Sequence, residues 1–221
     1  MVIRALIAVR SGSVRVPSKN IRPFAGKTIT EYKIEQLLRI KELDGIVVNS
    51  NDDEILELCS KYEVELVKRE PYFASNEVSM SEVYKNMAEC FTGDVVVYAN
   101  ATSPLLSDKS ISSAINLYKD LDEKFDSLNT THLIKEFLFL DGRPLNYDLK
   151  KQPRSQDLPD IHAINFALSI ISKGKMIEYS NVVGLHPYLF VLEEKESTDI
   201  DSLLDFEIAE FLFKKGVDNS V

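Results

Sequence analysis

The strongest constraint on the fold is a regular alternation between short apolar segments and longer segments with helical spacing. Short apolar runs occupy residues 3–9, 45–48, 63–67 and 94–99, and helical patterns occupy residues 29–40, 52–62 and 79–91. Strands separated by helices of this length pair in parallel, and the run DVVVYA suits a strand buried on both faces. The pattern predicts an α/β fold with a doubly wound, mainly parallel sheet.

This rhythm changes between about residues 130 and 160, where charged residues, Pro and Gly become frequent. The sequence LDGRPL at residues 140–145 predicts a turn between two short strands. We therefore expect a single domain over residues 1–221 with a small inserted lobe or arm. Its aromatic residues Phe137 and Phe139 would serve a contact between two copies of the chain or, equally, belong to a surface hairpin packed on its own domain.

Composition and length exclude several classes of protein. The chain has 221 residues, 44% of them hydrophobic, and a formal net charge of −9, which suits one acidic globular domain. Its apolar runs are shorter than the ~20 residues of a membrane helix, and residues 1–10 resemble a buried strand more than a secretion signal. We expect a cytoplasmic protein with no membrane partner. The acidic balance argues against nucleic acid, which needs a basic face.

The loop directly after the first strand is the most informative segment. It reads RSGSVRVPSKN at residues 10–20, and four cations, Arg10, Arg15, Lys19 and Arg22, fall within 13 residues. Backbone N–H groups of a Ser/Gly turn and Arg and Lys side chains are the usual ligands of phosphate. The loop matches neither GxxxxGK[ST] nor GxGxxG. Because ligands bind at the carboxyl ends of strands in open α/β sheets, it is interpreted as a phosphate-binding loop rather than a solvated basic turn.

A second candidate site is the sequence TDID near the end of the chain. If the segment is extended, Asp199 and Asp201 project from one face, a spacing suited to a hard cation such as Mg²⁺. The alternative is an acidic turn that caps a helix beginning near Ser202. Asp205 fits better as a first-turn charge that favours the helix dipole.

Five segments together resemble the acylneuraminate cytidylyltransferases, the CMP-sialic acid synthetases, and more distantly the CMP-Kdo synthetases. They are RSGSVRVPSKNIRPFAGKTI (10–29), VVNSNDDEI (47–55), REPYFASN (69–76), NATSPL (100–105) and STDIDSLLDFEIAE (197–210). Their order and spacing agree from about residue 3 to residue 213. The resemblance implies a Rossmann-like nucleotidyltransferase that transfers CMP from CTP to an α-keto acid sugar and releases pyrophosphate. It also implies Mg²⁺ or Mn²⁺ as cofactor and a homodimer formed through the inserted lobe.

The resemblance assigns roles to individual residues. Arg10 and Lys19 would be catalytic cations on the triphosphate, and Asp201 would act on the acceptor hydroxyl and, with Asp199, hold the metal. Nucleotide contacts are expected from Ala8, Arg10, Ser11, Gly12, Ser13, Arg15, Lys19, Asn20, Arg69, Asn76 and Ser81, with Arg69 the best candidate for reading the base. Acceptor contacts are expected from Asn100, Thr102, Ser103, Gln156 and Asn165. Ser81 as a plain helix-start residue and Asn165 as a structural amide remain alternatives.

The sequence departs from the family pattern at several of these motifs. Val14 replaces a common Lys, Asn51 an Asp and Asn100 a Gln. Ala163 stands where the sialic acid enzymes carry an Arg, and their Asn-Gly-Ala run reads Asn165, Phe166, Ala167. The last changes concern the acceptor side, so we predict retained CTP and metal chemistry with an acceptor other than N-acetylneuraminate. A Kdo-type or non-sugar acid acceptor, or a binding protein without turnover, are the alternatives.

Overall fold

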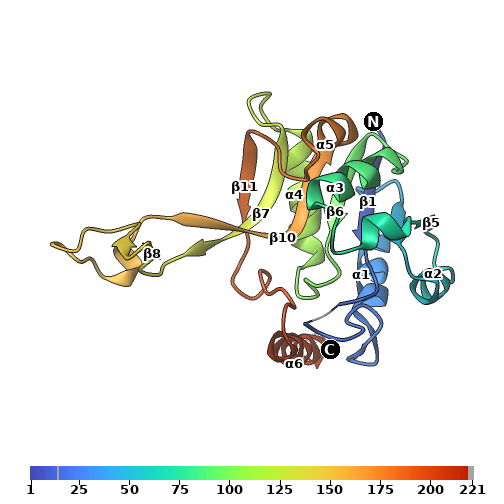
Figure 1. Cartoon of the computed structure of the whole chain (residues 1–221), viewed down its shortest axis with the longest axis horizontal. Coiled ribbons are helices and arrows are strands. Elements are labelled where there is room, and N and C mark those ends of the chain that lie inside the picture. The colour runs from blue at the N-terminus through green and yellow to red at the C-terminus, as the bar shows by residue number, and fades with distance from the viewer. Residues whose placement is uncertain (14, 219–221) are drawn as a thin grey trace.

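The structure, a computed structural model, describes residues 1–13 and 15–218. Val14, one of the departures from the family pattern, lies outside the described residues. Figure 1 shows a central sheet covered by helices and a long arm that projects from one side. The two ends of the described chain contribute to the same body.

The central sheet has seven strands in the order β11-β7-β10-β6-β1-β4-β5. Their bounds are β1 Ile3–Ala8, β4 Ile46–Ser50, β5 Glu65–Lys68, β6 Val95–Ala99, β7 Ser127–Ile134, β10 Ile161–Ser172 and β11 Pro187–Val191. The pairs β1–β4, β1–β6, β4–β5 and β7–β11 are parallel, and β10 is antiparallel to its neighbours β6 and β7. The predicted mainly parallel sheet is confirmed.

The described residues form six α-helices, whose starts follow ordinary capping chemistry. The helices are α1 Ile29–Leu38, α2 Asp53–Cys59, α3 Met80–Glu89, α4 Asp108–Lys119, α5 Lys173–Tyr179 and α6 Leu203–Asp218. Thr28 and Glu31 form a capping box at α1, and Ser79 and Glu82 form one at α3. Asp52 caps α2, which leaves the neighbouring Asn51 side chain for another role.

Two apolar clusters lie on opposite faces of the sheet. On one face, Ile7 and Val97 pack with residues of α1, α2, α4 and α6. On the other face, Leu6 and Tyr98 pack with residues of α3 and α5. Because side chains of a strand alternate between its two faces, one strand serves both clusters. Helices on both faces make the sheet doubly wound, as predicted.

The order of the strands locates a topological switch between β1 and β6. From β1 the chain moves outward through β4 to β5, and α3 then returns it to β6 on the other side of β1. Connections that leave β1 and β6 diverge at the carboxyl ends of these strands, where ligands bind in open α/β sheets. The basic loop at residues 10–20 follows β1, and residues 100–105 follow β6.

The inserted segment forms the arm, which leaves the sheet after β7 and returns at the start of β10 (Figure 1). The predicted turn is confirmed, because β8 (Phe139–Leu140) pairs antiparallel with β9 (Arg143–Pro144). Two short 3-10 turns, η1 (Pro71–Ala74) and η2 (Ser155–Asp157), and a small hairpin, β2 (Pro23–Phe24) with β3 (Lys27–Thr28), complete the described elements.

Two further observations concern membrane spans and thiols. Among residues 1–13 and 15–218, no helix has the length and apolar character needed to cross a membrane. Cys59 is a buried free thiol and Cys90 an exposed one. Burial raises the pKa of Cys59 to about 11, so this thiol stays protonated and acts as a small core residue.

Candidate functional site

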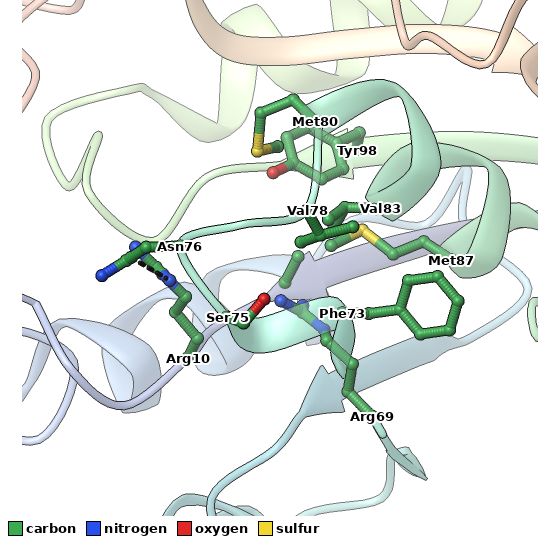
Figure 2. Close-up of a pocket in the computed structure, with 11 residues that line it drawn as sticks. Arg10, Arg69, Phe73, Ser75, Asn76, Val78, Met80, Val83, Met87 and Tyr98 are labelled. Atoms are coloured by element: carbon green, nitrogen blue, oxygen red, sulfur yellow. Dashed lines mark hydrogen bonds between the residues drawn. The ribbon is translucent and has the colours of Figure 1, made fainter. Parts of the chain in front are cut away.

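A cavity of about 320 Å³ lies beside the carboxyl ends of β1 and β6 (Figure 2). It is lined by Ala8, Arg10, Arg69, Phe73, Ser75, Asn76, Val78, Met80, Val83, Met87 and Tyr98. Four of these residues, Ala8, Arg10, Arg69 and Asn76, are nucleotide contacts predicted from the sequence. Apolar walls with a few polar groups are typical of small-molecule sites, and the size suits a planar base. We call this space the base cavity.

Arg69 is the main buried charge of the base cavity. Its side chain is 4% exposed, and it donates from Nε to Oδ1 of Asn49 at 2.6 Å and from Nη2 to the Asn49 carbonyl at 3.2 Å. Burial lowers the pKa of Arg69 to about 10, so the guanidinium is still charged at neutral pH. Figure 2 shows it pointing into the cavity. Its remaining N–H groups can donate to a ring nitrogen or carbonyl of a base.

Arg10 lies between the base cavity and the basic loop. Its Nη1 donates to the Ala74 carbonyl at 2.8 Å and to Oδ1 of Asn76 at 3.2 Å. Figure 2 shows this contact at one end of the base cavity. Arg10 also lines a smaller cavity enclosed by the loop. Arg10 therefore borders both the base cavity and the cavity inside the loop.

The loop after β1 surrounds a second cavity of about 40 Å³, which we call the loop cavity. It is lined by Arg10, Ser11, Gly12, Ser13, Ser18, Lys19, Asn20, Ile21, Asp52 and Ile55. Gly12 has a φ of 81°, a left-handed conformation that favours glycine. Asn51 donates to Ser11 Oγ at 3.0 Å, and the buried Asn20 donates to the Arg10 carbonyl at 2.9 Å. These two amides hold the shape of the loop.

The basic loop meets the acidic motif from the other end of the chain. Lys19 Nζ donates to the Ile200 carbonyl at 2.5 Å across a sequence separation of 181 residues. Arg15 Nη2 lies 2.6 Å from Asp201 Oδ1. Burial lowers the pKa of Lys19, and the nearby carboxylates of Asp199 and Asp201 act in the opposite direction. Two motifs predicted separately from the sequence thus form one site.

The acidic pair has the arrangement expected of an extended segment. Ile200 lies between the two acids and is fully buried in the core, while Asp199 and Asp201 are partly exposed. Asp199 Oδ1 is buried and has no hydrogen-bond partner in the described part of the chain. Burial raises the pKa of Asp199, against a hydrogen bond from Thr102 that lowers it. An unpartnered carboxylate oxygen beside a second carboxylate fits a hard divalent cation that shares phosphate oxygens and water as further ligands.

Asp205 takes the role of the capping acid at α6. Its Oδ2 accepts hydrogen bonds from the Ser202 N–H at 2.7 Å and the Asp201 N–H at 3.1 Å. The Ser202 hydroxyl in turn accepts from the Asp205 N–H at 3.2 Å. The carboxylate of Asp201 is consequently not needed to start the helix, which removes the main structural alternative for the acidic pair.

The acceptor candidates Asn100 and Asn165 meet beside a β-bulge in β10. Asn100 Nδ2 donates to the Phe166 carbonyl at 3.0 Å. Asn165 Oδ1 accepts from Thr130 Oγ1 at 2.7 Å and from the Ala167 N–H at 3.1 Å. Phe166 has a φ of 54°, the region that favours glycine, and the family pattern has Gly at this position. Phe166 therefore adopts, within this irregular stretch of β10, a backbone conformation that glycine adopts more easily.

Three buried polar atoms at these strand ends have no hydrogen-bond partner within residues 1–13 and 15–218. They are Ser103 Oγ, Asn165 Nδ2 and Asp199 Oδ1. Thr102 connects Ser103, its neighbour in the chain, to Asp199. Its side chain bonds Asp199, and its carbonyl accepts from the Ile200 N–H at 2.9 Å. Buried polar groups are nearly always paired, so unpartnered atoms grouped here indicate a ligand site.

A sequence profile of the cytidylyltransferases matches residues 4–206. The chain belongs to the cytidylyltransferase family. A pseudaminic acid cytidylyltransferase of Campylobacter jejuni is 28% identical over 220 residues, 95% of each chain. A CMP-N,N'-diacetyllegionaminic acid synthase of the same species is 27% identical over 95% of this chain and 94% of its own. An N-acylneuraminate cytidylyltransferase of Escherichia coli is 23% identical over 94% of this chain and 51% of its own.

Solved structures of cytidylyltransferases share the fold. A CMP:2-keto-3-deoxy-manno-octonic acid synthetase solved with CTP has a TM-score of 0.75 at 12% identity, covering 98% of this chain and 100% of its own. A 4-diphosphocytidyl-2C-methyl-D-erythritol synthase from Anaerococcus prevotii has a TM-score of 0.68 at 15% identity, covering 96% of each chain. The resemblance read from five sequence motifs is confirmed, and the enzyme class is nucleotidyltransferase.

Two predicted site residues of this cytidylyltransferase lie apart from the rest. Ser81 is exposed on α3 and does not line the base cavity, and Ser79 rather than Ser81 caps that helix. Gln156 is exposed on η2 in the arm, which projects away from the body (Figure 1). Their roles as ligand contacts remain predictions.

Sequence reasoning missed the apolar wall of the base cavity. Tyr98, Met80, Val83 and Met87 have the spacing and composition of ordinary core residues, and Val83, Met87 and Tyr98 also belong to the apolar cluster under α3. The available signal was the tyrosine at the end of β6, since a hydroxyl in an otherwise apolar strand needs a polar neighbour.

Proposed function

We propose that this cytidylyltransferase joins CMP from CTP to an acidic sugar of the nonulosonate type and releases pyrophosphate. The observation that carries the proposal is the hydrogen bond of 2.5 Å from Lys19 to the Ile200 carbonyl, which joins the basic loop to the acidic pair, while Arg10 of the same loop lines the base cavity. The names of relatives that act on pseudaminic, legionaminic and acylneuraminic acids support the acceptor class.

The residues of the loop would bind and neutralise the triphosphate. Lys19 and Arg15 carry positive charge at the junction with the acidic motif, and Arg10 lies nearer the base. Backbone N–H groups around Gly12 add dipoles that favour an anion. Holding the α-phosphate among fixed cations stabilises charge that develops in the transition state and aligns pyrophosphate as leaving group.

We infer that Asp199 and Asp201 would hold Mg²⁺ or Mn²⁺. The unpartnered Oδ1 of Asp199 supports this assignment, and one or two carboxylates with substrate phosphates is the usual protein share of a magnesium site. The bound cation would supply Lewis-acid neutralisation of phosphate charge. Asp201 is the more accessible acid, since half of its side chain is exposed, and it is the candidate to accept the proton of the acceptor hydroxyl.

We place the acceptor between residues after β6 and a cavity of about 530 Å³ at the end of β7. This cavity is lined by His132, Leu133, Ile134, Lys135, Glu136, Val191, Leu192, Glu194 and Ser197. His132 is two residues beyond Thr130 on the same face of β7, and Thr130 bonds Asn165. His132 Nδ1 is a further buried atom with no partner among the described residues. The acceptor would thus reach from Asn165 toward His132.

The experiment is an assay of pyrophosphate release with CTP, Mg²⁺ and a panel of acids. The panel contains pseudaminic acid, a legionaminic acid, N-acetylneuraminate, Kdo and a non-sugar α-keto acid. We expect turnover with a nonulosonate other than N-acetylneuraminate, because Asn100 and Ala163 alter the acceptor side. The highest kcat/KM with N-acetylneuraminate would overturn the prediction about the acceptor. Absence of turnover with every acid would overturn the proposed function.

We further propose a homodimer formed through the arm and a cytoplasmic location. Phe139, Leu140, Leu145 and Leu149 are between 54% and 62% exposed on the arm, more apolar surface than a free hairpin favours. The location follows from the substrate, because CTP is an intracellular nucleotide. Light scattering at micromolar concentration would give twice the mass of one chain for the dimer, whereas the mass of one chain would contradict it.

A further inference from the structure

Lys33, on α1, is a buried lysine for which the proposed reaction gives no role. Its side chain is 1% exposed and donates to Gln36 Oε1 at 2.7 Å and to the Ser103 carbonyl at 3.1 Å. Asp108 attracts it electrostatically, but that carboxylate is bonded to Arg39 and Gln36. Removing an ammonium group from water costs several kcal/mol unless it is well paired. A leucine or methionine would fill the same space at lower cost, so the amine itself needs an explanation.

The hydrogen bonds of Lys33 and Gln36 hold the segment that follows β6. Lys33 binds the Ser103 carbonyl, and Gln36 Nε2 donates to the Leu106 carbonyl at 2.5 Å. Both donors come from one turn of α1. The segment is therefore attached at two points to a helix that begins directly after the β2–β3 hairpin and the basic loop.

The same segment reaches the acidic pair on its other side. Thr102 precedes Ser103, its carbonyl accepts from the Ile200 N–H at 2.9 Å, and its hydroxyl bonds Asp199. Ser103 Oγ is one of the buried atoms of the site that have no hydrogen-bond partner among the residues that the structure describes. A shift of the Ser103 peptide would therefore move both a hydroxyl offered to the acceptor and the hydroxyl that orients Asp199.

We propose that Lys33 is a positioning residue that fixes the Thr102–Ser103 segment for the acceptor and for Asp199. The inference rests on the proposed function, because it assumes that an acceptor binds beside these residues. The hydrogen bonds that Lys33 donates do not depend on whether its amine is protonated. Burial lowers the pKa of Lys33 to about 7, and both the ammonium and the neutral amine donate hydrogen bonds.

The test compares Lys33→Met with Lys109→Met, an exposed lysine on α4. Pseudaminic acid serves as the acceptor probe. We expect Lys33→Met to raise the KM for the acceptor about tenfold, the usual effect of one lost hydrogen bond to a charged donor, with the KM for CTP changed less than about twofold. Lys109→Met should match the parent in both constants.

Hydrogen exchange of the parent and the variant gives a readout that needs no turnover. The Ser103 amide bonds the Asn100 carbonyl and the Ile200 amide bonds the Thr102 carbonyl, so both report on the segment. We expect both to exchange about tenfold faster in Lys33→Met, while the Val9 amide, which follows β1 and bonds the Asn49 carbonyl, is unchanged. If both amides exchange faster in Lys33→Met but the parent itself shows no turnover, the proposed function is refuted while the positioning role of Lys33 is supported.

Two results would overturn the inference. One is unchanged exchange of the Ser103 and Ile200 amides in Lys33→Met. The other is an equal rise of both KM values, which indicates general loosening of the fold. If Lys33→Met does not fold, Gln36→Met removes the Leu106 contact and one partner of Lys33, and the same split between the acceptor and CTP constants decides the question.

Discussion

Arg15 Nη2 lies 2.6 Å from Asp201 Oδ1, which joins a basic loop near one end of the chain to an acidic motif near the other. Their side chains are 69% and 50% exposed, so this is a surface pair worth ~0–1 kcal/mol. An ion pair this weak breaks readily when either side chain gains a stronger partner. In the proposed function, a divalent cation at Asp201 would replace the guanidinium there and leave Arg15 to bind a phosphate oxygen.

Arg15→Ala tests this exchange. We expect CTP affinity in the presence of Mg²⁺ to fall about tenfold, the effect of one lost charge-assisted hydrogen bond, while the free energy of unfolding changes by less than ~1 kcal/mol. Calorimetric titration and urea unfolding measure the two quantities. Arg143→Ala is the control, since Arg143 is exposed on β9 in the arm and should leave CTP affinity unchanged. Loss of stability with unchanged affinity would show that Arg15 has only a structural role.

Arg69→Met tests the assignment of the base cavity. The variant removes a guanidinium that is 4% exposed and points into the cavity, so the affinity for CTP should fall by ~1.5–3 kcal/mol, about 10- to 100-fold. Titration with CTP measures the loss. The adjacent Lys68→Met, on the exposed side of β5, provides the matched control. CTP binding equal to that of the parent would mean that the base occupies another position.

Lys33 makes stability depend on pH in an unusual direction. Its pKa is about 7 in the folded chain and near 10.5 when the chain is unfolded. Between these values the unfolded chain binds more protons at this site, so stability rises with pH across the window, by at most ~1.4 kcal/mol per pH unit. Urea unfolding at pH 7, 8 and 9 should show that the free energy of unfolding of the parent rises with pH relative to that of Lys33→Met. If the free energies of unfolding of the two proteins change equally with pH, the burial of an ionisable lysine is contradicted.

The arm provides a prediction about assembly. Phe139→Asp combined with Leu140→Asp places two charges on its exposed apolar tip, where the side chains are 54% and 61% exposed. Desolvating these charges at an interface is costly, so the variant should be monomeric at micromolar concentration while the thermal stability of the single chain stays close to that of the parent. Analytical ultracentrifugation distinguishes the two states. A variant that remains dimeric would place the interface elsewhere.

Much of the fold could be predicted because the core strands are buried on both faces. The runs that became β1, β4 and β6, which are buried on both faces, were located to within two residues. The partly exposed edge strand β5 was located to within two residues as well, although burial of both faces does not explain it. Burial of both faces leaves continuous apolar runs, and these are hard to mistake. The sequence also singled out the basic loop and the acidic pair, and the structure brings them together through the Lys19–Ile200 hydrogen bond and the Arg15–Asp201 pair. Their roles toward phosphate and a divalent cation remain predictions.

Other features depend on tertiary packing and have no sequence signal. Lys33 occupies a helix position that suggests a solvent-facing charge, and its burial arises only when the segment after β6 packs against α1. Tyr98 and Met87 line the base cavity but have the pattern of core residues. Gln156 lies on the arm, within the predicted insertion, but spacing along the chain does not determine where an insertion projects, so its contact with the acceptor remains a prediction.

The measurement that tests the central claim most directly is the separation of CTP binding from turnover in Asp201→Ala. If the acidic pair and the basic loop form one catalytic centre, the variant should lose pyrophosphate release by ~10²-fold or more and bind CTP within about tenfold of the parent. Glu207→Gln, an exposed acid on α6, should behave as the parent. Pyrophosphate release by Asp201→Ala at the rate of the parent would remove Asp201 from the mechanism and contradict the account.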